Sequence, residues 1–105
     1  MVFLAEFVKV AKEADLKEGE GKVVEANGLQ IALFKKGGKF FALDNACLHA
    51  GGPIGEGSLD EEEFVMCPWH GWRYNIHNGE NDFDETLKLK TYNTKVLGGE
   101  VLVEI

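Results

Sequence analysis

The chain has 105 residues, of which 45% are hydrophobic and 28% are charged, a balance typical of a single folded domain and unlike that of a disordered segment. The net charge of −7 argues against nucleic acid binding, which needs a cationic surface, and it favours protein partners with basic surfaces. No stretch approaches the roughly 18 apolar residues of a membrane-spanning helix, and residues 1–10 lack the pattern of a secretion signal. We therefore expect a soluble, cytoplasmic protein.

The sequence predicts strands on both sides of a central segment. Runs of β-branched and aromatic residues alternate with polar residues, although residues 4–12 also fit a short helix. Strands are predicted at residues 4–12, 23–25, 29–34, 40–43, 87–96 and 100–105. Three dipeptides are typical of tight hairpin turns, namely Asn27-Gly28, Gly37-Gly38 and Gly98-Gly99. The predicted fold class is all-β, with antiparallel sheets.

Residue types that carry chemistry are concentrated between residues 44 and 84. This segment holds both cysteines, all three histidines, both tryptophans and both prolines. Cys47 and His49 form one close pair, and Cys67 and His70 form another. Two thiolates and two imidazoles suit either one tetrahedral zinc ion or an iron–sulfur cluster whose two irons take different ligands. A typical zinc finger groups its cysteines before its histidines, so the mixed pairs favour the cluster, and a zinc-stabilised binding module is the alternative.

The two pairs resemble the cluster-binding loops of Rieske-type 2Fe-2S proteins. The resemblance rests on Cys47-x-His49 and on CPWHGWR from Cys67 to Arg73, and it is specific over residues 44–79. It implies that Cys47 and Cys67 bind one iron of a 2Fe-2S cluster while His49 and His70 bind the other. It also implies a single Rieske domain over residues 1–105, an antiparallel sandwich or barrel. Residues 44–84 would form a cluster-binding subdomain of two glycine-rich loops.

A Rieske cluster carries less negative charge than a cluster with four thiolates, because two neutral histidines replace two thiolates. It is therefore reduced more easily, at potentials of roughly −150 to +300 mV. Such a site transfers one electron and needs no substrate pocket, so we expect no catalytic residues. The resemblance implies an electron carrier, a ferredoxin, between a flavin-containing reductase and a terminal oxygenase. The small Rieske subunit of an assimilatory nitrite reductase is an alternative within the same family.

Three positions depart from the Rieske proteins of quinol-oxidising complexes. Those proteins join the loops by a disulfide and place a serine after the second His-Gly, whereas this chain has Gly52, Trp69 and Trp72 at those positions. The loss of a hydroxyl donor predicts a reduction potential at the low end of the range. The chain also lacks the proline-containing loop that covers the cluster in many relatives. The resemblance therefore does not predict how far His49 and His70 are shielded from solvent.

The remaining features have less specific interpretations. Acidic runs at residues 56–63 and 80–85 are either a solvated face or a surface that steers a basic partner. His77 is expected to be an exposed turn residue and not a ligand. Trp72 is expected to pack in the core, and Tyr74 is expected to pack between strands without a redox role.

Overall fold

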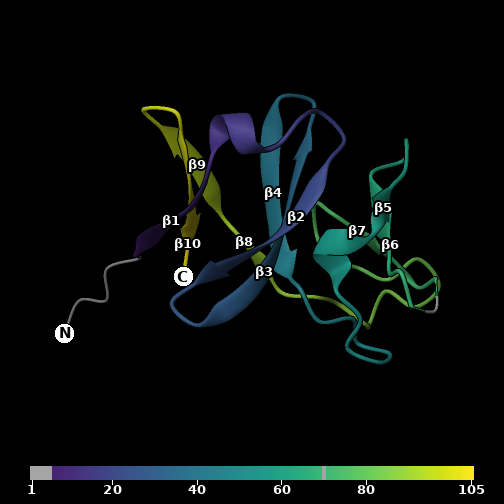
Figure 1. Ribbon diagram of the computed structural model, residues 1–105. Coiled ribbons are helices and arrows are strands. Elements are labelled where there is room, and N and C mark those ends of the chain that lie inside the picture. The colour runs from purple at the N-terminus through teal and green to yellow at the C-terminus, as the bar shows by residue number, and fades with distance from the viewer. Residues whose placement is uncertain (1–5, 70) are drawn as a thin grey trace.

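The computed structural model describes residues 6–69 and 71–105. Its strands form three antiparallel sheets, and helix within these residues is limited to two 3₁₀ turns, η1 (Glu13–Asp15) and η2 (Ile54–Glu56). Neither turn is long and apolar enough to cross a membrane. The predicted all-β, antiparallel class is confirmed. Figure 1 shows the long strands on one side of the molecule and a loop-rich lobe with short strands on the other.

Two sheets make up the larger lobe. One has the order β1-β10-β9 and the other has the order β2-β3-β4-β8. Their bounds are β1 (Phe7–Lys12), β2 (Gly21–Ala26), β3 (Leu29–Lys36), β4 (Lys39–Asp44), β8 (Thr91–Tyr92), β9 (Thr94–Leu97) and β10 (Glu100–Glu104). The first predicted strand is confirmed over β1, while residues 4 and 5 lie outside the described part of the chain.

The hairpin turns form where the sequence places them. Asn27 and Gly28 have φ of 49° and 85°, and the Gly37-Gly38 and Gly98-Gly99 pairs also have positive φ throughout. Positive φ at both central residues gives the turn the twist that a two-residue hairpin requires, and glycine and asparagine tolerate it best. These turns fix the register of β2 with β3, of β3 with β4 and of β9 with β10.

One predicted strand is wrong in part. Residues 87–90 form no strand, and Lys88 makes only an isolated bridge to Glu80. The segment instead runs from the loop-rich lobe back to the long strands, with Leu89 buried and its backbone N–H donating to the carbonyl oxygen of Gly79. Alternating hydrophobicity here reflects a half-buried crossing segment, which has the same pattern as a half-buried strand.

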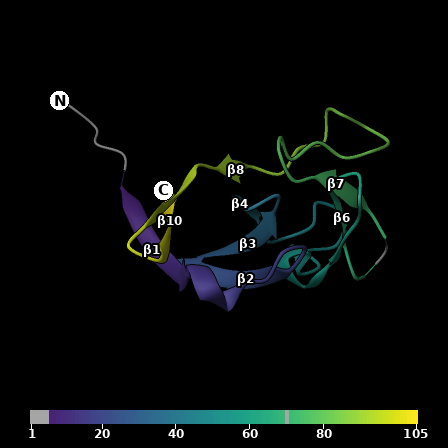
Figure 2. The same ribbon diagram turned by 90° about the horizontal axis from the view of Figure 1, so that it is seen from above.

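Strand β3 separates two hydrophobic cores. Successive side chains of a strand point to opposite faces, so Ile31 and Leu33 enter one core while Ala32 and Phe34 enter the other. All four are fully buried, which explains why the sequence here is continuously apolar. Figure 2 shows β3 between β1 and β10 on one side and β6 and β7 on the other.

The second core lies in the loop-rich lobe and contains both cysteines. A third sheet covers it, with the order β5-β6-β7 and bounds β5 (Ser58–Leu59), β6 (Phe64–Met66) and β7 (Arg73–Asn75). The cysteines pack there with Ile54, Val65, Tyr74, Ile76 and the β3 side chains. A subdomain over residues 44–84 remains a prediction, because residues from outside that range also contribute to this core.

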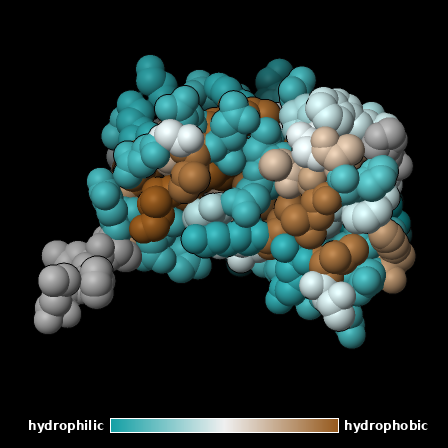
Figure 3. All heavy atoms as spheres, turned by 90° about the horizontal axis from the view of Figure 1, so that it is seen from below, coloured by the Kyte–Doolittle hydropathy of each residue, from teal (hydrophilic) through white to brown (hydrophobic). Residues whose placement is uncertain are grey.

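Large apolar side chains also reach the surface. Figure 3 shows brown areas on both lobes of the face seen from below. The exposed large hydrophobic residues are Leu29, Leu48, Met66, Trp69, Phe83, Val96, Leu97 and Ile105. Four of them, Leu48, Met66, Trp69 and Phe83, belong to the segment that carries the two Cys-His pairs.

Candidate metal centre

The first Cys-His pair lies in a tight loop that follows β4. The Cys47 N–H donates to the carbonyl oxygen of Gly52 at 3.0 Å, and the Gly51 N–H donates to the carbonyl oxygen of Cys47 at 2.8 Å. Gly51 has φ of 73°, a conformation that costs glycine little. These bonds close a turn that presents the thiol of Cys47 towards the second core.

The second loop, between β6 and β7, repeats this arrangement. The Cys67 N–H donates to the carbonyl oxygen of Trp72 at 2.7 Å, and the Gly71 N–H donates to the carbonyl oxygen of Cys67 at 3.1 Å. Gly71 has φ of 77° and, like Gly51, stands four residues after its cysteine. The sequence thus builds the same cysteine-anchored turn twice, once in each loop.

Both cysteines are buried, at 4% exposure for Cys47 and 1% for Cys67, and no disulfide joins them. Burial by itself would raise the pKa of the Cys47 thiol. Hydrogen bonds from the Tyr74 hydroxyl and the His49 backbone N–H outweigh burial and lower it, with further contributions from Cys67 and from the Ala50 N–H. The thiolate is the form of cysteine that binds metal ions, so a buried cysteine whose thiolate is stabilised by hydrogen-bond donors is suited to metal ligation.

Tyr74 supports Cys47 from β7. Its hydroxyl oxygen lies 3.3 Å from the Cys47 sulfur and accepts a hydrogen bond from the Leu48 N–H at 3.2 Å, which leaves the hydroxyl proton for the sulfur. Burial and the bond to Cys47 raise the pKa of Tyr74, so the group stays a donor at neutral pH. The expectation that Tyr74 only packs between strands is incomplete. A buried tyrosine needs a hydrogen-bond partner for its hydroxyl, so the expected burial of Tyr74 is the sequence feature that indicates such a contact.

Gly52 lets the two loops approach each other. A Cβ atom at this position would lie 2.6 Å from the Cys67 sulfur and 3.1 Å from the Trp69 ring. Any larger residue would therefore displace the second thiol. Gly52 stands at one of the two positions where quinol-oxidising relatives carry their disulfide. In this chain the small residue at that position lets the first loop lie close to Cys67 and Trp69 of the second loop.

His49 is exposed and lies against Trp72. The two rings are stacked, with centroids 4.6 Å apart and an interplanar angle of 9°. Trp72 is half-buried and packs at the edge of the second core, so the expectation of core packing is confirmed in part. The structure therefore brings Cys47, Cys67 and His49 to one end of the loop-rich lobe, whereas the predicted ligand His70 lies outside the described residues.

His77 is exposed, as predicted, and it belongs to a different contact. Its Nε2 atom lies 2.9 Å from a carboxylate oxygen of Glu63, and its ring meets the edge of Phe41 with centroids 4.5 Å apart. These contacts place it in the turn after β7. Neither of these two contacts involves a cysteine.

The fold and the paired loops define a small β-protein with two buried thiols and an exposed histidine gathered at one end of its loop-rich lobe. The family model of the Rieske 2Fe-2S domain matches residues 6–93. The chain belongs to the Rieske 2Fe-2S domain family. It is an electron carrier with a 2Fe-2S cluster and not an enzyme in its own right.

Curated relatives cover most of the chain. It is 32% identical over 98 residues to the ferredoxin component of the alkene monooxygenase system of Xanthobacter autotrophicus, covering 93% of this chain and 80% of that one. It is also 32% identical over 93 residues to the ferredoxin subunit of the 3-phenylpropionate/cinnamic acid dioxygenase of Escherichia coli, covering 88% of this chain and 87% of the relative.

Solved structures agree with the fold. The ferredoxin of carbazole 1,9a-dioxygenase from Nocardioides aromaticivorans superposes with a TM-score of 0.85 at 27% identity, covering 92% of this chain and 95% of that one. A ferredoxin in a complex with the oxygenase of carbazole 1,9a-dioxygenase gives 0.83 at 29% identity, covering 93% and 92%. A protein described as the small subunit of an NADPH nitrite reductase gives 0.81 at 23% identity, covering 93% and 97%, and this similarity shows the fold alone.

Proposed function

We propose that the chain passes single electrons from a flavin-containing reductase to a terminal oxygenase. In this proposal Cys47 and Cys67 bind one iron of the cluster and His49 and His70 bind the other. The relatives named above are ferredoxin components of a monooxygenase and a dioxygenase system, and one of the solved structures is a complex between a ferredoxin and an oxygenase. These similarities support an oxygenase as the electron acceptor.

The observation that carries the ligand assignment is the repeated loop. Two turns with the same hydrogen bonds place two buried thiols against each other, and backbone N–H groups and the Tyr74 hydroxyl stabilise the thiolate of Cys47. His49 projects from the first of these turns to the surface. An iron with two thiolates would therefore lie inward and an iron with imidazole ligands would lie towards solvent. The cluster supplies reversible uptake of one electron, and the chain supplies the donors that set its potential.

We place the reduction potential at the low end of the Rieske range. Trp72 occupies the position of the serine that donates to the cluster in quinol-oxidising relatives, and a tryptophan ring there stacks on His49 instead of offering a hydroxyl. Tyr74 still donates to Cys47, so this chain keeps one hydroxyl donor to a cysteine sulfur. Fewer donors stabilise the reduced, more negative state less, so the potential falls.

The net charge of −7 supports partners with basic surfaces, and buried thiols suit a reducing compartment such as the cytoplasm. The charge would raise the rate of association with a basic reductase or oxygenase and leave that rate sensitive to salt.

Detecting the nitrogen ligands of the cluster tests the proposed ligand set directly. Pulsed EPR of the reduced protein should detect couplings from two histidine nitrogens. His49→Cys and His70→Cys should each remove one coupling and lower the potential, while the matched variant His77→Cys should leave both couplings and the potential unchanged. Two couplings that persist in His70→Cys would overturn the assignment of that residue. A reductive titration of the wild type should take up one electron per chain.

A further inference from the structure

Three aromatic rings lie in contact, from the proposed ligand His49 to the surface. The His49 and Trp72 rings are stacked with centroids 4.6 Å apart, and the Trp72 ring meets Phe83 at 4.8 Å with an interplanar angle of 76°. Both spacings lie in the range of favourable aromatic pairs. We call His49, Trp72 and Phe83 the ring series. It joins the first loop, the end of the second loop and the acidic run at residues 80–85.

Phe83, at the outer end of the ring series, is 59% exposed. Burying a phenylalanine side chain stabilises a fold, so an exposed one forgoes stability that a buried one would have. The segment that carries Phe83 is nevertheless well ordered by hydrogen bonds. Asn81 is 3% exposed, accepts from the N–H groups of Phe83 and Asp84 at 3.0 and 3.1 Å, and donates to the carbonyl oxygen of Arg73 at 3.2 Å.

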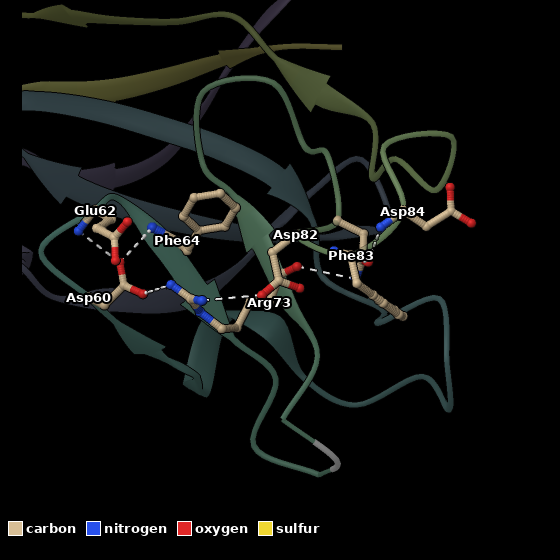
Figure 4. A network of polar contacts seen from close by, with 8 residues as sticks. Asp60, Glu62, Phe64, Arg73, Asp82, Phe83 and Asp84 are labelled. Atoms are coloured by element: carbon tan, nitrogen blue, oxygen red, sulfur yellow. Dashed lines mark hydrogen bonds and ion pairs between the residues drawn. The ribbon is translucent and has the colours of Figure 1, made fainter.

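Arg73 holds the same segment from the other side. Its guanidinium group pairs with Asp82 at 3.2 Å and with Asp60, and it thereby joins the acidic run to the turn before β6. Figure 4 shows the Phe83 ring and the Asp84 carboxylate pointing away from this network. Phe83 is thus presented on a fixed support, and a side chain that is already ordered loses less conformational entropy when it binds a partner.

The charge around Phe83 is negative. Asp84 and Glu85 follow it directly, both are exposed, and no ion pair joins either to a cation within residues 6–69 and 71–105. The other carboxylates of the run are compensated, since Asp82 pairs with Arg73 and Glu80 lies 3.9 Å from Lys88. Phe83, Asp84 and Glu85, which we call the Phe83 patch, therefore combine an exposed aromatic ring with uncompensated negative charge.

We propose that the Phe83 patch is a docking surface for a basic protein partner and that the ring series couples that partner electronically to the cluster. This inference rests on the proposed function, because it takes His49 to be a cluster ligand. An aromatic anchor with a charged rim is the composition of a binding hot spot, and the negative rim selects a partner whose apolar contact site is surrounded by lysine or arginine.

The electron transfer step balances without bond making or proton transfer. With a cluster held by the proposed ligands, one electron would pass from the reduced cluster to a one-electron acceptor in the partner, such as a ferric haem, so that one centre is oxidised as the other is reduced. Trp72 and Phe83 are not themselves oxidised. Their contacts shorten the gap that the electron must cross, and electronic coupling across a packed gap decays less steeply than across solvent.

Cytochrome c, a basic haem protein that accepts one electron, is a suitable probe. The variants are Phe83→Ala, Glu85→Gln and Trp72→Phe. The matched controls are Leu97→Ala, whose side chain is 58% exposed in β9, and Glu6→Gln, next to β1 in the other lobe. For each protein, the iron content and EPR spectrum are checked first, the affinity for cytochrome c is measured by surface plasmon resonance, and the rate of haem reduction is measured by stopped flow.

Phe83→Ala should weaken binding and slow haem reduction by about tenfold, as expected for an aromatic interface anchor. Glu85→Gln should slow reduction about twofold at low ionic strength and not at high ionic strength. Trp72→Phe should leave the affinity unchanged and lower the rate of transfer within the complex. Leu97→Ala and Glu6→Gln should behave as the wild type.

Equal rates for Phe83→Ala and Leu97→Ala would overturn the docking surface. A wild-type dimer that Phe83→Ala dissociates would also overturn it, because the patch would then bind a second copy of the chain. An unchanged rate within the complex for Trp72→Phe would overturn the role of the ring series. Failure of the proposed function is separate from these results, since it would show as a wild-type protein without a reducible cluster.

Discussion

The hydroxyl group of Tyr74 lies 3.3 Å from the sulfur atom of Cys47, 27 residues earlier in the chain. The contact joins β7 of the third sheet to the first loop, and the same hydroxyl oxygen accepts a hydrogen bond from the Leu48 N–H. A donor aimed at a ligand sulfur stabilises the more negative, reduced state of an iron–sulfur centre. In the proposed site Tyr74 would therefore tune the cluster through Cys47, although it is not itself a predicted ligand.

Tyr74→Phe should lower the reduction potential. A net hydrogen bond contributes about 1 kcal/mol, which corresponds to about 40 mV for a one-electron couple on the scale of 59 mV per tenfold change. Protein-film voltammetry measures the shift. Tyr92→Phe is the matched control, because the Tyr92 hydroxyl donates to Asp44 at 2.6 Å and makes no contact with the cysteines. Equal potentials for Tyr74→Phe and the wild type would contradict the role of this hydroxyl.

Gly52→Ala should prevent normal cluster assembly. The added Cβ atom would lie 2.6 Å from the Cys67 sulfur, a distance that forces the thiol or the loop to move. We expect less than about half of the wild-type iron per chain after reconstitution, since the second thiol would leave its ligating position. Gly98→Asn is the control, because Gly98 has φ of 57° and open space around it, and asparagine tolerates that conformation. A full iron content in Gly52→Ala would show that the loops have room to relax.

The sequence predicts the parts of the fold that depend on local geometry. Asn27-Gly28 and Gly37-Gly38 fix hairpins through their backbone conformation alone, so the strands on either side follow. The Cys-His pairs predict a metal centre because few other roles require those residue types at that spacing. Both signals are contained within a few neighbouring residues.

The parts that could not be predicted depend on tertiary contacts. A hydrophobic pattern shows that Tyr74 is buried, but only the packing of β7 against the first loop brings its hydroxyl to Cys47. The stacking of Trp72 on His49 likewise joins two loops whose relative position is not encoded locally. The predicted strand at residues 87–90 is wrong because one buried face gives a crossing segment the alternation of a strand.

Asp60 should make stability depend on acid pH. Burial would raise its pKa, but hydrogen bonds from the Phe64 N–H and Arg73, the ion pair with Arg73 and the bond from the Glu62 N–H outweigh it and lower the pKa. A lowered carboxyl pKa contributes stability that is present above the ordinary aspartate pKa and is lost as pH falls through the lowered value. Asp60→Asn should therefore lower the urea midpoint at neutral pH. Because the Asp60 side chain is 38% exposed and solvent screens its ion pair, the loss of unfolding free energy should be only about 0.5 kcal/mol.

The difference between Asp60→Asn and the wild type should shrink as pH falls from the ordinary aspartate pKa through the lowered pKa of Asp60, because the wild-type carboxylate then takes up its proton. Glu61→Gln is the control, because Glu61 is exposed in the same turn and should show no such change. Urea unfolding of the loaded protein across acid pH measures both variants. A constant difference at every pH would mean that Asp60 acts through its shape and not through its charge.

The content of iron, zinc and acid-labile sulfide per chain tests the central claim most directly. Anaerobically purified protein should contain about two irons and two sulfides per chain, as a Rieske 2Fe-2S centre requires, and no stoichiometric zinc. One zinc per chain with no sulfide, persisting after reconstitution with iron and sulfide, would contradict the account and show that the paired loops hold a structural metal ion.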